Sequence, residues 1–293
     1  KVAIKVLPRQ RAQDNASVAR FLNEAKSAAR LNHEHIAQVY FCGEDNGIPY
    51  IAFEYVEGIN IRSYVEKNGV IPLPEAINFI LQITSAIAHA ASHGVTHRDV
   101  KPSNILITPQ GKAKLIDMGL ARLLKPTAFE DDLTASGVTL GTFDYISPEQ
   151  ARDPRNADVR SDIYSLGCTF FFMLTGQPPF PEGTVLQKLL KHQGDEPPDV
   201  RTFAPNTPPE VSMVIQKMMA KNPNNRFQNP KVLINVLIEI AEMIGLQPPA
   251  PGQVVWSLPP RQQKSLFLRH FPWVISVLLL FIIVWGMEYF FVR

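Results

Sequence analysis

The stretch HRDVKPSN, residues 97–104, gathers several chemically reactive side chains in one short segment. Asp99 offers a carboxylate, Lys101 adds an ammonium two residues later, and Asn104 adds an amide three residues beyond that. A carboxylate in a loop can accept the proton of a hydroxyl group, and a nearby ammonium can neutralise charge on a group in transfer. The spacing therefore indicates a catalytic loop that handles an anionic group.

A predicted hairpin follows this loop. Strand-like runs at residues 105–107 and 114–116 flank the turn sequence PQG at residues 109–111. Such a hairpin would bring a second carboxylate, Asp117, back beside the loop. Together with the amide oxygen of Asn104, this carboxylate predicts a site of hard oxygen ligands, the kind that Mg²⁺ prefers.

Residues 1–243 have the pattern of a mixed α and β region. VAIKVL at residues 2–7 is a β-branched run typical of a strand, while residues 17–31 and 74–93 have helical spacing. From residue 161 onward helices dominate, and the predicted ranges are 161–175, 184–192, 209–220 and 229–244. Strands first and helices afterwards predict the α+β class, with a small sheet-rich lobe and a larger helical lobe.

The composition excludes several classes of protein. Lys plus Arg is 29 and Asp plus Glu is 27, which gives a net charge of +2. A nucleic-acid coat protein needs a strong basic excess, so we expect no nucleic-acid partner. Cys42 and Cys168 are too few for a disulfide framework or a four-cysteine zinc site, and we expect free thiols in a reducing compartment.

Several motifs occur together in one order: VAIK at residues 2–5, HRDVKPSN, DMG at residues 117–119 and SPE at residues 147–149. In this order the chain resembles the eukaryotic-like protein kinase family over residues 1–243. The resemblance implies the two-lobe kinase fold and ATP-dependent phosphoryl transfer to proteins. DVKPSN, GTFDYI and SPEQ are similar to bacterial single-pass receptor-type serine/threonine kinases, which implies Ser and Thr acceptors.

The resemblance implies a role for each reactive residue of the loop. Asp99 would be the catalytic base that orients the substrate hydroxyl, and Lys101 would stabilise the γ-phosphoryl group. Asn104 and Asp117 would hold Mg²⁺, which offsets charge on the phosphate oxygens. His97 is expected to have a structural role in packing.

The resemblance also implies the ATP site. Lys5 would grip the α- and β-phosphates, and Glu24, within FLNEAKSAARL, would be its ion-pair partner. IAFEYVEG at residues 51–58 resembles the connection between the lobes, with Phe53 facing the back of the pocket. The expected adenine contacts are the backbone groups of Glu54 and Val56 and the side chains of Ala3 and Leu106.

An activation segment is expected from Asp117 to Glu149. Thr142, in GTFDY, resembles the threonine that hydrogen-bonds near the catalytic base. The candidate phosphorylation sites, with a solvated Ser/Thr-rich loop as the alternative, are Thr134, Ser136 and Thr139. Arg98 supplies a cation that could pair with such a phosphate and order the loop.

Two further contacts are implied outside the reactive loop. Glu149 would pair with Arg226, and Asp162 would brace the catalytic loop from the helix predicted at residues 161–175. Met118 stands where the family usually has phenylalanine, and its flexible apolar side chain can fill much of the same volume. We expect this difference to affect the balance between packings of the activation segment and to leave metal binding intact.

The C-terminal stretch differs from everything before it. Residues 245–270 form a proline-rich basic linker, and residues 271–292 are strongly apolar and carry no charge apart from Glu288. As one helix the apolar run would span roughly 33 Å, enough for a bilayer core, and a buried core helix is the alternative. Basic residues beside a span mark its cytoplasmic side, and here they are Arg261, Lys264 and Arg269. We therefore expect a single-pass protein of the cell membrane with a cytoplasmic kinase domain, and a homodimer is one option.

The predicted organisation has four parts: a partial N-lobe and hinge (1–56), a C-lobe (57–244), the linker (245–270) and a transmembrane helix (271–292). The Gly-rich loop of the family is not found before the opening strand, so we expect a fragment that alone is nearly inactive. Two hypotheses for the whole protein remain. It is an active serine/threonine kinase, or a catalytically weak pseudokinase that serves as a membrane scaffold.

Overall fold

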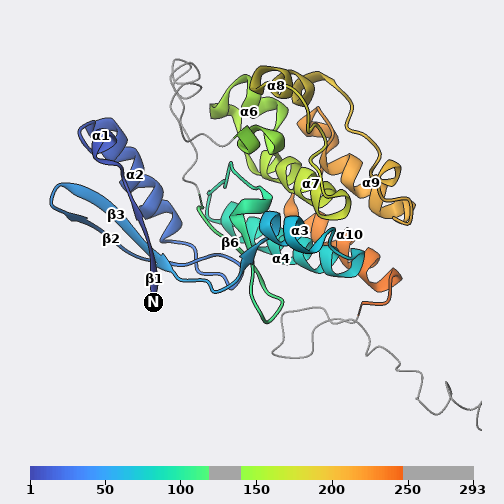
Figure 1. Cartoon of the computed structure of the whole chain (residues 1–293), viewed down its shortest axis with the longest axis horizontal. Coiled ribbons are helices and arrows are strands. Elements are labelled where there is room, and N and C mark those ends of the chain that lie inside the picture. Colours follow the sequence, from blue (N-terminus) through green and yellow to red (C-terminus); the bar gives the residue numbers. More distant parts are fainter. Residues whose placement is uncertain (119–139, 247–293) are drawn as a thin grey trace, which may run out of the picture. The chain divides into compact units, whose positions relative to one another are not determined.

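The structure is a computed structural model that describes residues 1–118 and 140–246; within them, the side chains of Glu24 and residues 140–142 are excluded. The predicted membrane span at 271–292 and nearly all of the predicted linker lie outside the described residues. In the described ranges, strands come mainly first and helices afterwards, so the predicted α+β class is confirmed (Figure 1).

An antiparallel sheet in the order β1-β3-β2 opens the chain. Its strands and the helices beside it are β1 (Val2–Val6), α1 (Arg9–Ala12), α2 (Asn15–Ala28), β2 (Val39–Asp45) and β3 (Ile48–Glu54). Helix α2 packs against β2 and β3 (Figure 1). The hairpin between those two strands turns at Asn46 and Gly47, whose φ angles of 48° and 75° are left-handed. Asn-Gly tolerates this geometry, which suits a two-residue hairpin turn.

A second sheet positions the reactive loop. It has the order β4-β5-β6, with strands β4 (Ile59–Asn60), β5 (Ile105–Ile107) and β6 (Ala113–Leu115). The hairpin predicted at residues 105–116 is therefore confirmed. Leu115 N donates to His35 O at 2.8 Å, and Ala37 N donates to Leu115 O at 2.9 Å. These bonds join the segment before β2 to the strand that leads into Asp117.

Helices form the rest of the described chain. They are α3 (Ile61–Asn68), α4 (Leu73–Ser92), α6 (Pro148–Arg152), α7 (Val159–Thr175), α8 (Val185–Gly194), α9 (Pro209–Met218) and α10 (Pro230–Met243). The short 3₁₀ turns are η1 (Pro102–Asn104), η2 (Leu140–Tyr145), η3 (Pro154–Asn156), η4 (Val200–Thr202) and η5 (Pro223–Asn225). Helix α7 packs against both α4 and α9 and is buried from Ser161 to Leu174. It therefore forms a rigid base for the side chains that it sends into the site.

No helix within residues 1–118 and 140–246 is long and apolar enough to cross a membrane.

Four histidines meet where the segment before β2 packs on the end of α4. The ring centroids of His33 and His89 lie 5.1 Å apart, and those of His89 and His93 lie 4.4 Å apart. His35 lies 5.5 Å from His33, and a ring nitrogen of His33 lies 3.2 Å from Ser85 Oγ. Burial, reinforced by the neighbouring histidines, lowers the pKa of His33 to about 4, and burial also lowers the pKa values of His35 and His89.

We expect this cluster to make the free energy of unfolding fall as the pH drops from about 6.5 toward 4. The unfolded chain binds protons near the ordinary pKa of 6.5, whereas folded His33 binds one only near pH 4, so acid favours unfolding. For the half-buried His33 alone the loss should be on the order of 1 kcal/mol. Urea unfolding at pH 7 and pH 5 measures it. His33→Gln should flatten the dependence, and an unchanged slope in that variant would contradict the assignment.

Candidate active site

Asp162 of α7 holds the backbone of the catalytic loop in place through hydrogen bonds. Its carboxylate accepts hydrogen bonds from His97 N at 2.8 Å and Arg98 N at 2.7 Å. Burial raises the pKa of the Asp162 carboxyl, while these two donors act in the opposite direction. Arg98 has a φ of 66°, which is unusual for a residue with a side chain, and the bond to its N–H helps to fix that conformation. The predicted brace is confirmed.

His97 links the loop to the segment that carries Asp117. One ring nitrogen, Nε2, lies 3.0 Å from Ile116 O, and the other, Nδ1, accepts from Asp99 N at 3.2 Å. In this arrangement Nε2 carries the proton and donates to the carbonyl. The ring is fully buried. The structural role predicted for His97 is thereby confirmed.

The side chains of Asp99, Lys101 and Asn104 come together as their spacing predicted. Lys101 Nζ lies 2.8 Å from Asp99 Oδ2, and Asn104 Nδ2 donates to the same oxygen at 3.0 Å. Asn104 Nδ2 also donates to Asp99 O at 2.8 Å, which fixes the carboxylate relative to its own backbone. Both of these side-chain contacts are made to Oδ2, and among the described residues none is found to Oδ1. An oriented carboxylate with one oxygen available is suited to accept a hydrogen bond from a hydroxyl group.

Asp117 follows directly beside this group. Ile116 N donates to Asn104 O at 2.9 Å, and Asp117 itself has a φ of 60°. Its Oδ1 lies 3.0 Å from Lys5 Nζ on β1. The predicted pairing of Lys5 with Glu24 stays a prediction, because Glu24 lies in α2 but its side chain is outside the described set. The structure brings the predicted phosphate-binding ammonium to the predicted metal-binding carboxylate.

The donors at Asn104 and Asp117 fit a small hard cation. The amide nitrogen of Asn104 donates to Asp99 O and Oδ2. The amide oxygen of Asn104 therefore points away from Asp99. In the described part of the chain, no group of three or more His, Cys, Asp or Glu side chains is placed to hold a metal ion. One carboxylate and one amide oxygen nevertheless match Mg²⁺, which keeps several waters and binds phosphates as further ligands.

The predicted adenine contacts lie on both sheets. Ala3 pairs with Phe53 across β1 and β3, and Leu106 is half-buried on β5. The Glu54 side chain accepts from Lys114 Nζ at 2.6 and 2.8 Å, so it fastens β3 to β6. Val56 follows in the connecting segment and is half-buried. Contact of these four residues with adenine stays a prediction.

The segment that follows the predicted activation loop is tied to the catalytic loop. Gln150 of α6 donates to Arg98 O at 2.8 Å, and Gln150 also forms a capping box with Ser147. Thr142 belongs to η2, but its side chain is outside the described set. The candidate phosphorylation sites Thr134, Ser136 and Thr139 also lie outside the described residues. Their modification stays a prediction.

Glu149 and Arg226 form the predicted pair, in bidentate geometry at 2.7 and 2.9 Å. Ser161 Oγ donates to Glu149 at 2.6 Å, and the guanidinium stacks over Tyr164 at 4.8 Å from the ring centroid. The remaining donors of Arg226 reach the carbonyl oxygens of Ala220, Arg160 and Lys221. Burial disfavours the charged carboxylate, but the bonds from Arg226 and Ser161 outweigh it, and the pKa of Glu149 lies below its ordinary value.

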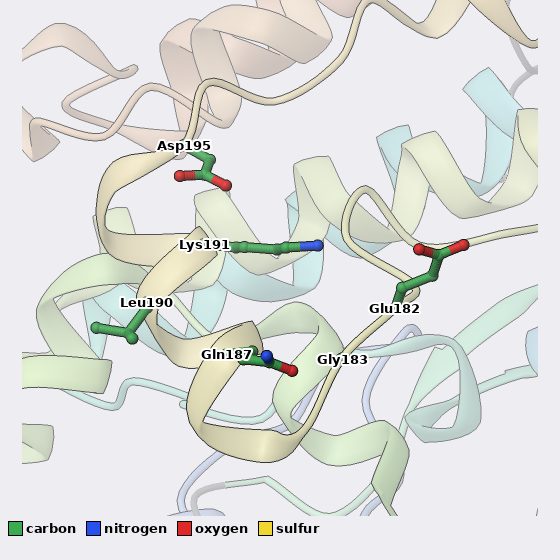
Figure 2. Close-up of a pocket in the computed structure, with 6 residues that line it drawn as sticks. All are labelled: Glu182, Gly183, Gln187, Leu190, Lys191 and Asp195. Atoms are coloured by element: carbon green, nitrogen blue, oxygen red, sulfur yellow. The ribbon is translucent and has the colours of Figure 1, made fainter.

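An open pocket of about 430 Å³ lies on the outer side of α8 (Figure 2). The residues that line it are Glu182, Gly183, Gln187, Leu190, Lys191 and Asp195. None of them belongs to the predicted ATP, metal or catalytic residues. This pocket therefore shares no lining residue with the predicted catalytic site.

Comparison with known proteins agrees with the site geometry. The family described as protein kinase domain matches residues 1–237. Serine/threonine-protein kinase PknB of Mycolicibacterium smegmatis is 41% identical over 255 residues, which cover 85% of this chain and 40% of PknB. Serine/threonine-protein kinase PrkC of Bacillus subtilis is 42% identical over 228 residues, which cover 78% of this chain and 34% of PrkC.

Solved structures show the same relationship. The crystal structure of the Mycobacterium tuberculosis PknI kinase domain superposes with a TM-score of 0.64 at 28% identity, and the match covers 82% of this chain and 85% of that chain. The chain spans two fifths or less of the length of the two curated relatives. Because the family match covers most of the chain and the relatives share its sequence over that length, the chain belongs to the protein kinase family.

Proposed function

We propose that the protein to which this chain belongs transfers the γ-phosphoryl group of ATP to serine and threonine hydroxyls of protein substrates. The observation that carries the proposal is the Asp99 carboxylate, oriented by Lys101 and Asn104 and placed beside Asp117. Relatives named as serine/threonine kinases at 41% and 42% identity support the class of acceptor.

Asp99 would orient the acceptor hydroxyl and take its proton as the oxygen–phosphorus bond forms. The bond between the γ-phosphorus and the bridging oxygen breaks, and ADP keeps that electron pair. Lys101, already 2.8 Å from Asp99, would neutralise charge on the phosphoryl group in transfer. Asn104 and Asp117 would hold Mg²⁺, which supplies further charge neutralisation at the phosphate oxygens when bound.

We further propose that the kinase is tethered to the cell membrane by residues 271–292, with the catalytic domain on the cytoplasmic side. The support is the length of the apolar run and the basic residues Arg261, Lys264 and Arg269 before it. A tethered kinase confined to two dimensions meets other copies at high effective concentration, so a homodimer belongs to the same proposal.

The test uses the kinase with its complete catalytic domain, labelled ATP, Mg²⁺ and protein acceptors. We expect label on serine and threonine and none on tyrosine. Lys5→Met removes a charge-assisted contact to phosphate, and we expect kcat/KM for ATP to fall about 10- to 100-fold. Lys26→Met, an exposed lysine on α2, is the matched control and should leave it unchanged. Label on tyrosine alone, or full activity of Lys5→Met, would refute the proposal.

A further inference from the structure

A buried ion pair joins α8 to η2. Lys188 Nζ lies 2.5 Å from Asp144 Oδ1, and the two side chains are only 7% and 12% exposed. Lys188 is on the inner face of α8, whereas Gln187 and Lys191 project on the outer face that Figure 2 shows. A lysine this deeply buried requires a charged partner, since an unpaired ammonium would be strongly destabilised.

The part of α8 that carries Lys188 is held rigidly against α7. One turn further along α8, the buried ring of His192 contacts the hydroxyl of Tyr164 on α7 at 2.9 Å. The same ring packs edge-on against Phe180, with centroids 5.0 Å apart. Helix α8 is thereby fixed to α7, the helix that also carries Asp162 to the catalytic loop. The position of the Lys188 ammonium is set by the same core as the position of Asp99.

Asp144 lies in the segment that leads into α6, the helix whose Gln150 is hydrogen-bonded to the catalytic loop. The next residue, Tyr145, packs edge-on against Phe172, and Gln150 donates to Arg98 O beside Asp99. On its open side Asp144 helps to line a pocket of about 350 Å³. The other charged and aromatic residues of that pocket are Arg62, Glu66, Tyr145 and Phe172. Through Gln150, this segment is linked to the backbone next to Asp99.

We propose that Lys188 is a positioning residue for the protein substrate, a role that rests on the proposed function. Its ammonium holds Asp144, and with it residues 143–146, in the place where this segment contacts the polypeptide around the acceptor hydroxyl. Two apolar side chains of similar volume would give equal or greater stability in such a buried position. The effect of the pair is therefore orientation of the segment, and it should appear in the binding of the protein acceptor and leave nucleotide binding unchanged.

The experiment compares four variants of the kinase with its complete catalytic domain: Lys188→Met, Lys188→Arg, Asp144→Asn combined with Lys188→Met, and Lys191→Met. The measurements are KM for a protein acceptor, KM for ATP, kcat and the melting temperature. Lys188→Met and the double variant should raise the acceptor KM about tenfold and change the ATP KM less than about twofold. Lys188→Arg should restore most of the acceptor binding. Lys191→Met, on the outer face of α8, should change neither KM.

The double variant separates positioning from stability, because it removes both charges and leaves no unpaired ion in the core. If Lys188→Met alone fails to fold, the double variant still tests whether the ion pair positions the segment for the protein acceptor. A double variant with normal melting temperature and normal acceptor KM would overturn the inference while the kinase activity stands. A wild-type enzyme that transfers no phosphoryl group to serine or threonine would overturn the proposed function and this inference together.

Discussion

Asp99→Asn is expected to lower kcat for phosphoryl transfer by about 10²- to 10⁴-fold, the range for removal of a general base. Asparagine has nearly the same shape and keeps one oxygen for Lys101 and Asn104, which now meet at Asp99 Oδ2. Its amide nitrogen would then face the acceptor hydroxyl and could not take a proton. Steady-state kinetics on the kinase with its complete catalytic domain measure the change. The melting temperature should stay within about 2 °C, since the asparagine oxygen still accepts from Lys101 and Asn104.

The matched control is Asp45→Asn, an exposed aspartate at the end of β2. It makes the same chemical change and should leave kcat unaltered. Equal phosphoryl transfer by Asp99→Asn and wild type would exclude the assigned base. The scaffold hypothesis makes a different forecast, because a pseudokinase would show little transfer in either protein.

Arg226→Met is expected to have the largest effect on stability. Its guanidinium is completely buried, and it meets Glu149, which is 15% exposed, through two hydrogen bonds. Removal of one partner from such a pair leaves a buried charge, which costs about 3–5 kcal/mol. For a domain of this size the melting temperature should fall by about 6–20 °C. Chemical denaturation at pH 7 gives the free energy of unfolding directly.

Two further variants test the reason for this loss. Glu149→Gln combined with Arg226→Met removes both charges, so part of the stability should return. Arg155→Met breaks an ion pair with Asp153 that lies at the surface, and it should cause no measurable change. If Arg226→Met were no less stable than Arg155→Met, burial of the pair would not explain its contribution.

Much of the fold could be predicted from the sequence because its signals are local. The predicted helices at 74–93, 161–175 and 229–244 differ from α4, α7 and α10 by at most two residues at either end. The β2–β3 hairpin was missed, although Asn46-Gly47 between two β-rich runs is a recognised turn signal. The helix at 61–68 was also missed, since it is short and its polar residues conceal the apolar face formed by Ile61 and Val65.

The contacts that the sequence could not supply join residues far apart in the chain. Lys5 and Asp117 are separated by 112 positions, and no local pattern in the sequence indicates their contact. Lys188 sits on an amphipathic helix, where a lysine ordinarily faces solvent, so its burial against Asp144 has no local sequence signal. Asp99, Lys101 and Asn104 were predictable because six consecutive residues contain them all and a single 3₁₀ turn, η1, brings them together.

The contact between Lys5 and Asp117 also sets a limit on nucleotide affinity. Phosphate oxygens that approach the Lys5 ammonium must compete with this carboxylate, which lies 3.0 Å from it. Both side chains are more than a third exposed, so the ion pair contributes less than about 1 kcal/mol of free energy. Breaking it can therefore weaken the apparent affinity for nucleotide by no more than about fivefold. The ion pair is therefore a weak contact that an approaching phosphate group displaces at little cost.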